Sequence, residues 1–125
     1  MEPVFLSKLV SQSNGWLSAR QAAIAENVAN ANTPGFKSKD IEPFTSVISK
    51  TRLSMTATHG SHMGTETDGP RASKVRKADS WLVTHSGNSV SIEQELVKAG
   101  EVARSHALNA SLAKSFHRMY LTSLK

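Results

Sequence analysis

Apolar residues recur at helical spacing through the first thirty positions of the chain. One side of the helical wheel holds Leu6, Val10, Leu17, Ile24, Val28 and Ala31, with Phe5, Leu9 and Trp16 at its margin. Lys8, Gln12 and Glu26 fall on the opposite side. The pattern predicts an amphipathic helix over residues 1–31. We expect a bend or fraying near Gly15, because glycine costs a helix about 1 kcal/mol relative to alanine.

A second helix is predicted over residues 92–125, and its start is well marked. Ser91 can accept a hydrogen bond from the backbone N–H of Gln94, whose own side chain can reach back, as in a capping box. Glu93 and Glu95 then lie in the first turn, where acids favour the helix dipole. Ser91 and Gln94 are therefore predicted as the helix cap.

The second helix carries apolar residues on two sides. A seam with small residues in its middle consists of Ile92, Leu96, Ala99, Ala103, His106, Ala110, Ala113, His117, Tyr120 and Leu124. A second stripe, roughly opposite, consists of Leu108, Leu112, Phe116 and Met119. One partner helix cannot cover both, and apolar surface without a partner in the chain indicates association with other molecules. We interpret the second stripe as a subunit interface.

Residues 32–91 form a turn-rich and then basic loop between the helices. Few large apolar side chains occur there, so this loop cannot build a core of its own. It has room for a short β-hairpin, and residues 80–85, SWLVTH, suit a short strand or a docking segment. The predicted fold is mainly α: one domain over residues 1–125, with the terminal helices paired as an antiparallel or coiled-coil-like hairpin.

The net charge of +5 is concentrated in this loop. From Lys50 to Lys77, six Lys or Arg face two acids. A small basic helical module for nucleic acid or an acidic partner is therefore an alternative function. Aromatic residues are not interleaved with the basic run, as nucleic-acid recognition usually requires.

The sequence shows no arrangement typical of an enzyme, a cofactor site or a metal site. Phosphate-binding and zinc-protease motifs are absent, and there is no cysteine. His59 and His62 form the one close histidine pair, without an acid suited to completing a metal site. His106 and His117 would lie roughly 16 Å apart on a helix, too far to share a metal. We expect no catalytic residues, no cofactor and no metal.

A cluster of amides and a turn sequence end the first helix. It consists of Asn27, Asn30, Asn32, Thr33, Pro34, Gly35 and Phe36. The last carbonyls of a helix lack partners, and asparagine can donate to them or adopt the left-handed conformation that closes a helix. Pro34 and Gly35 fit the central positions of a type II turn, after which Phe36 would anchor against a helix. On these grounds the cluster is a sharp, rigid stop.

Residues 17–40, LSARQAAIAENVANANTPGFKSKD, resemble the N-terminal signature of the flagellar rod, hook and hook-filament junction family. In that family an arginine, here Arg20, precedes a run of the form I-A-x-N-[IV]-A-N-A-x-T-P-G-[YF], which residues 24–36 match. Around the start of the second helix, the chain is similar to the proximal rod subunits of the family. The matching residues are Gly87, Asn88, Val90, Ile92, Glu93 and Glu95.

The resemblance implies a structural protein without enzymatic activity, in the rod of the bacterial flagellar basal body. It implies assembly through the terminal helices with other copies of the chain, FlgC-like rod proteins, a FliE-like adaptor at the MS ring and the export gate. The N-terminus lacks the features of a cleaved signal peptide, and the family is exported by the flagellar type III apparatus. Phe5 and Leu9 fit an aromatic-x-x-x-aliphatic export pattern, although both also suit the apolar margin of the helix.

Overall fold

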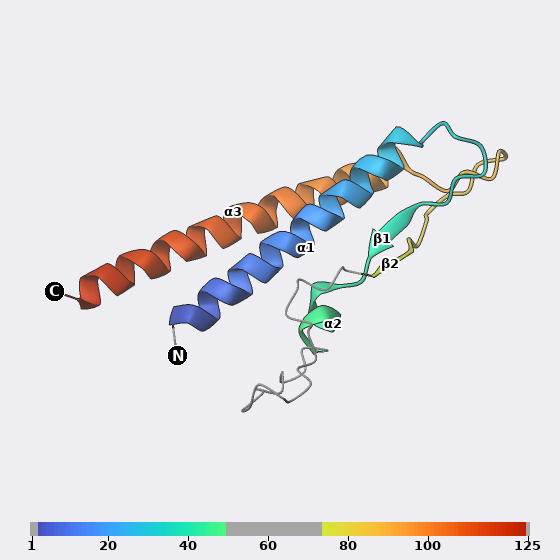
Figure 1. The fold of residues 1–125 in the computed structure, drawn as a ribbon. Helices are drawn as coiled ribbons and strands as arrows, with labels where there is room; N and C mark the ends of the chain where they lie inside the picture. The colour runs from blue at the N-terminus through green and yellow to red at the C-terminus, as the bar shows by residue number, and fades with distance from the viewer. Residues whose placement is uncertain (1–2, 50–73, 125) are drawn as a thin grey trace, which may run out of the picture.

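The terminal helices of the chain lie side by side and antiparallel (Figure 1). The computed structural model describes residues 3–49 and 74–124. Its elements are α1 (Pro3–Ala29), β1 (Lys39–Ile41), α2 (Phe44–Ser49), β2 (Val75–Lys77) and α3 (Ile92–Ser123). The predicted mainly α hairpin is confirmed, with β1, β2 and α2 placed along one side of α1 (Figure 1).

The α1 helix continues through Gly15 without a break, so the fraying considered there does not occur. A neighbour on α3 supports this region, because the side-chain amide of Asn109 donates to Ser13 Oγ and Asn14 Oδ1, each over 2.9 Å. α1 ends at Ala29, two residues before the predicted end, where the backbone N–H of Asn30 bonds to Glu26 and Asn27. α3 begins at Ile92, as predicted.

The core between the two helices is small. Leu17, Ile24 and Val102 form its buried cluster, with Trp16 and Ala99 packed against them. Alanine-rich helices bring backbones close together but bury little apolar area per residue. Polar groups therefore take a large share of the buried positions, among them Asn27, Asn88, Glu95 and Lys98.

The first turns of α3 present to α1 a face that differs from the predicted seam, whereas Ala99 of that seam packs against the core and Ala113, His117 and Tyr120 line a groove with α1. Ile92 and Leu96, which begin that seam, are 57% and 71% exposed. The buried positions of the first turns are instead Glu95, Lys98 and Val102. Glu95 and Lys98 occupy the inner face of α3. A prediction that assigns only apolar residues to that face therefore places the wrong side of the helix against α1.

The β structure is a two-stranded antiparallel ribbon. β1 and β2 pair in the register Lys39 with Lys77, Asp40 with Arg76 and Ile41 with Val75. The sequence left room for a short β-hairpin in the loop without fixing its position, and this two-stranded antiparallel ribbon agrees with that expectation. Residues 80–85 form no strand, which corrects one of the two interpretations of that segment. Its apolar residues are exposed, as described below.

Candidate functional site

The motif that ends α1 is built around a type II turn. The N–H of Phe36 donates to the carbonyl of Thr33 over 3.3 Å, which closes a four-residue turn with Pro34 and Gly35 at its centre. Gly35 has a φ of +74°, as the third position of this turn requires. Among the described residues, apart from its two chain neighbours, no atom lies within 4 Å of the position that a Cβ of Gly35 would take. The backbone conformation, not crowding, therefore makes glycine the suitable residue.

The three asparagines of the motif have three different environments. Asn30 donates to the carbonyl of Glu26 over 2.8 Å and so satisfies the helix end, as predicted. Asn27 is fully buried and bonds to the backbone of Lys39 instead, accepting from its N–H at 2.9 Å and donating to its carbonyl at 2.7 Å. Asn32 is exposed. Among the described residues only glycines have positive φ, so none of these asparagines takes the left-handed conformation considered above.

Asn88 completes the end of α1, a role that was not predicted from its sequence. Its side-chain amide donates to the carbonyls of Asn30, Ala31 and Thr33 over 2.9, 2.9 and 2.8 Å. Its side-chain oxygen accepts from the N–H of Val90 over 2.7 Å. Its match to the family pattern beside Gly87 was the available signal, but nothing in its local sequence indicates a partner more than fifty residues away.

Residues 33–38 and 84–89 are bonded to each other, and we call this pair of segments the clasp. The N–H of Gly35 donates to Ser86, and the N–H of Ser89 donates to Phe36, each over 3.0 Å. The N–H of Ser38 donates to Ser89 Oγ over 2.9 Å. The segments approach closely at two glycines, because a Cβ added to Gly87, which has a φ of +79°, would lie 3.7 Å from the Cα of Gly35.

Phe36 is half-buried at the edge of the clasp. The contact that the structure gives its ring is with the ammonium of Lys39, 5.8 Å from the ring centroid. The predicted anchoring of this ring against a helix is not among the described packing contacts of the core. The aromatic side chain of the motif therefore pairs with a cation beside β1.

The start of α3 follows the prediction in one half of the capping box. Ser91 accepts from the N–H of Gln94 over 3.4 Å. The side chain of Gln94 donates to the carbonyl of Asp79 over 2.7 Å, so its predicted return to Ser91 is wrong. Hydrogen bonds from the Glu93 backbone and from the Ser91 hydroxyl lower the pKa of the Glu93 carboxyl. The cap thus fixes the helix start and also holds the chain that precedes it.

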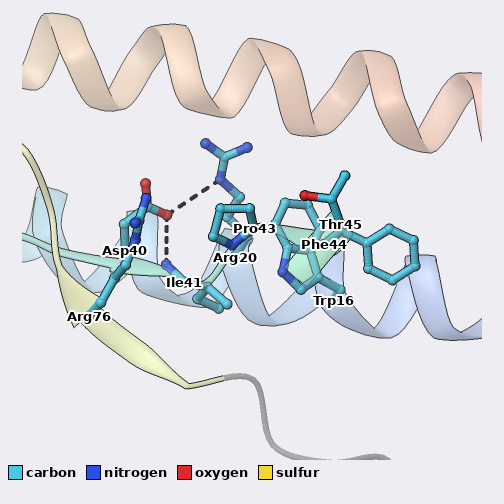
Figure 2. Close-up of a pocket in the computed structure, with 8 residues that line it drawn as sticks. All are labelled: Trp16, Arg20, Asp40, Ile41, Pro43, Phe44, Thr45 and Arg76. Atoms are coloured by element: carbon cyan, nitrogen blue, oxygen red, sulfur yellow. Dashed lines mark hydrogen bonds and ion pairs between the residues drawn. The ribbon is translucent and has the colours of Figure 1, made fainter. Parts of the chain in front are cut away.

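A cluster of opposite charges fills the space between α1, β1 and α3. Lys98 Nζ lies 2.9 Å from Glu95 Oε1 and 3.6 Å from Asp40 Oδ2. Arg20 lies with its Nε 3.5 Å from Asp40 Oδ1 and an Nη 3.4 Å from Glu101. Figure 2 shows Asp40 between Arg20 and the backbone N–H of Ile41, which donates to it over 2.7 Å. Buried charges of this kind need partners, and the ion pairs supply them in part, because Arg20 Nε and Glu95 Oε2 are buried without a hydrogen-bond partner among the described residues.

The same region has a hollow of about 190 Å³ next to Arg20 (Figure 2). Trp16 and Phe44 form part of its wall, with ring centroids 5.8 Å apart. The indole N–H of Trp16 donates to the carbonyl of Glu42 over 2.8 Å, and the Arg20 guanidinium lies over the Trp16 ring. Arg20, which precedes the motif in sequence, thus joins α1 to β1 and α3 at once.

The predicted interface stripe divides between two surfaces. Leu108, Leu112 and Met119 are exposed, at 60%, 49% and 61%. Phe116 is half-buried and lines a groove together with Leu6 and Val10 of α1, so the expectation that α1 leaves it uncovered is wrong. Of the predicted export residues, Phe5 is exposed and Leu9 is half-buried.

The described residues contain no group of three or more His, Asp or Glu side chains that could hold a metal ion. His59 and His62 lie outside the described residues. In the parts of the chain that the structure covers, no helix combines the length and the apolar character needed to cross a bilayer.

Comparison with known proteins gives a family match for the motif and a relative that matches the whole chain. Residues 17–37 match the model of the family described as flagella basal body rod protein. The chain is 41% identical over 135 residues to the flagellar basal body rod protein FlgB of Agrobacterium fabrum (strain C58 / ATCC 33970), covering all of this chain and 96% of the relative. Nothing in these matches favours nucleic-acid binding. The chain therefore belongs to the flagellar basal body rod proteins, the structural subunits of the flagellar rod.

Proposed function

We propose that this rod subunit forms part of the proximal rod and assembles with its neighbours through α1 and α3. The observation that carries the proposal is the 41% identity to a FlgB protein over the whole chain. The distribution of apolar residues supports it, because Leu108, Leu112 and Met119 stand exposed on α3. A monomer with this much apolar surface on one helix gains stability by association.

The clasp gives each copy the same shape for assembly. Asn88 and the paired glycines hold the loop before α3 against the end of α1. The charged cluster of Arg20, Asp40 and Lys98 then ties β1 to α1 and α3. Repeated packing needs identical units, since an interface residue that shifts in one copy misaligns the next.

The partners that we propose are other copies of the chain, FlgC-like rod proteins, a FliE-like adaptor at the MS ring and the flagellar export gate. Export would proceed without removal of a signal peptide, with Phe5 and Leu9 as candidate recognition residues. The protein would act without catalysis. The alternative of a basic nucleic-acid module predicts phosphate binding that weakens steeply with salt, and no observation favours it.

Deletion of the gene and complementation test the function. Cells without this chain should lack rods and swarming, and the wild-type chain should restore both. Complementation by a chain with Asn32→Ala, an exposed position of the motif, serves as the matched control. Normal rods in basal bodies purified from the deletion strain would reject the proposed function.

A further inference from the structure

The C-terminal half of α3 carries an apolar stripe on its outer side. Leu108, Leu112 and Met119 form this stripe and are 60%, 49% and 61% exposed. Their spacing places them within about 40° of one another around the helix axis. Val102 and Ala113, which lie against the core and the groove, occupy a different side of the helix. The stripe is therefore left uncovered by α1.

The half of the molecule that carries this stripe is basic. Residues 102–124 and residues 3–19, which form the ends of α3 and α1 nearest the chain termini (Figure 1), contain no Asp or Glu. Their cations are Lys8, Arg104, Lys114 and Arg118, all of them exposed. Glu2 and Lys125, one of each sign, lie outside the described residues. Arg104 and Arg118 fall beside the stripe on the helical wheel, so the apolar side chains and the cations share one exposed surface.

A second copy offers no acidic surface to match this one in the described part of the chain. Glu95 is buried against Lys98, and the exposed acids Glu26 and Glu101 pair with Lys39 and Arg20. The other exposed acids of the clasp half are Asp79 and Glu93, and the same half carries the exposed cations Lys37, Arg76 and Lys77. An anionic partner for the basic half must therefore be a different kind of molecule.

The combination of residues on this surface fits a lipid surface with negative headgroups. A basic amphipathic helix is typical of proteins that bind such surfaces. Its apolar side chains enter the boundary between the headgroups and the hydrocarbon, while long arginine side chains keep their charge among the phosphates. The stripe lies on the convex outside of a single helix, and a fluid lipid surface adapts to that shape.

We propose that the outer side of α3, from Arg104 to Met119, binds the surface of an anionic membrane without crossing it. Leu108, Leu112 and Met119 insert between the headgroups, and Arg104 and Arg118 contact their phosphates. The inference goes beyond the proposed function, because it concerns the free subunit before a neighbouring subunit covers the stripe. Binding concentrates free copies on one surface before they assemble.

Flotation of the purified full-length chain with lipid vesicles tests the proposal. One set of vesicles contains equal amounts of phosphatidylglycerol and phosphatidylcholine, and the other contains phosphatidylcholine alone. The partition coefficient should be at least about tenfold higher for the anionic vesicles, since each Lys or Arg near such a surface strengthens binding about fivefold. Added salt should reduce this difference, because it screens the attraction.

Paired variants test which cations are responsible. Arg104→Gln with Arg118→Gln should lower the partition coefficient on anionic vesicles about twentyfold. Arg76→Gln with Lys77→Gln removes the same charge from exposed positions of β2 and serves as the matched control. Its partition coefficient should stay within about threefold of the wild type, because these residues do not reach the lipid and act only through a screened potential.

A second pair of variants tests the apolar stripe. Leu112→Ser should lower the partition coefficient about tenfold, because a leucine side chain no longer leaves water on binding. Leu82→Ser removes an exposed leucine from the loop before α3 and should leave the partition coefficient unchanged. Circular dichroism establishes that all variants keep the helix content of the wild type.

Equal partition of the wild-type chain on the two kinds of vesicle overturns the proposal, as does an equal loss with the β2 control pair or with Leu82→Ser. Retention on immobilised polyglutamate without binding to anionic vesicles overturns it in favour of an acidic protein. A chain that restores rods in the deletion strain but binds no anionic vesicles loses only this inference. A chain that binds the vesicles but restores no rods loses only the proposed function.

Discussion

The side-chain amide of Asn88 donates to the carbonyl of Thr33 over 2.8 Å, across 55 positions of sequence. Two more carbonyls, of Asn30 and Ala31, share the same amide nitrogen. A single side chain in the loop before α3 therefore donates to three part-buried carbonyls at the end of α1. This relationship makes the clasp a part of both helices.

Asn88→Ala should lower the free energy of unfolding by about 1–3 kcal/mol, because the carbonyl of Ala31 loses its donor, whereas the carbonyls of Asn30 and Thr33 keep the N–H groups of Thr33 and Phe36. Urea denaturation followed by circular dichroism measures the change. Asn32→Ala, at an exposed amide of the same motif, should stay within about 0.5 kcal/mol of the wild type. Equal effects of the two substitutions would contradict the role given to Asn88.

Two Gly→Ala substitutions should change the free energy of unfolding in opposite directions. Gly35→Ala should destabilise the protein by about 1–3 kcal/mol, since the residue has positive φ. Gly15→Ala lies in the middle of α1 with no atom near its Cβ position, so it should stabilise by about 0.5–1 kcal/mol. Gly35→Asn should cost less than Gly35→Ala, because asparagine enters the left-handed region more readily. The melting temperatures of the three variants measure these changes. If Gly35→Ala leaves the melting temperature unchanged, the turn does not require positive φ at this position.

The charged cluster should be more sensitive to losing one partner than to losing two. Lys98→Met leaves the buried carboxylate of Glu95 without its cation and should cost about 3 kcal/mol. The double variant Glu95→Leu with Lys98→Met removes both charges, and Asp40 keeps Arg20 as its partner. We expect the double variant to recover most of the loss in urea denaturation. A double variant as unstable as Lys98→Met alone would show that the pair does not act as a unit.

Leu112→Asp and Phe116→Asp should separate assembly from folding. Leu112 is exposed on α3, so an aspartate there should leave monomer stability within about 0.5 kcal/mol while reducing the yield of basal-body rods. Phe116 lies beside Leu6 and Val10, and its aspartate should destabilise the monomer as well. Ser115→Asp, on the exposed surface of the same helix, controls for added charge. If cells with Leu112→Asp form normal rods, Leu112 is not part of the subunit interface.

Phe5→Ala should lower export of the chain without changing its stability. Phe5 is 60% exposed and contributes little to the core, whereas Leu9 is half-buried and would affect both properties. The fraction of the chain that reaches the periplasm is measured in cells at matched expression, with Lys8→Ala as the neighbouring control. Unchanged export would make Phe5 a surface residue without a role in recognition.

The two long helices could be predicted because each has a regular pattern and a clear boundary signal. Pro34 and Gly35 stop α1 soon after Ala29, and Ser91 caps α3, through contacts within a few residues of sequence. The type II turn was predictable for the same reason.

Long-range polar contacts could not be predicted. Glu95 and Lys98 look like surface residues in sequence, yet they are buried, because Lys98 pairs both with Glu95 and with Asp40 of β1. The apolar residues Ile92 and Leu96 suggested the wrong inner face as a result. Asn27 and Asn88 were likewise visible as motif residues, but their partners depend on where distant segments meet.

Polar contacts hold one half of α1 to its neighbours more firmly than the other half. In the described part of the chain, the side-chain hydrogen bonds that link α1 to other elements begin at Ser13 and end near Asn27. The turns before Ser13 meet α3 through apolar contacts around the groove. We therefore expect thermal opening to begin at the chain termini, where the first turns of α1 can separate from α3 while the clasp and the motif stay intact.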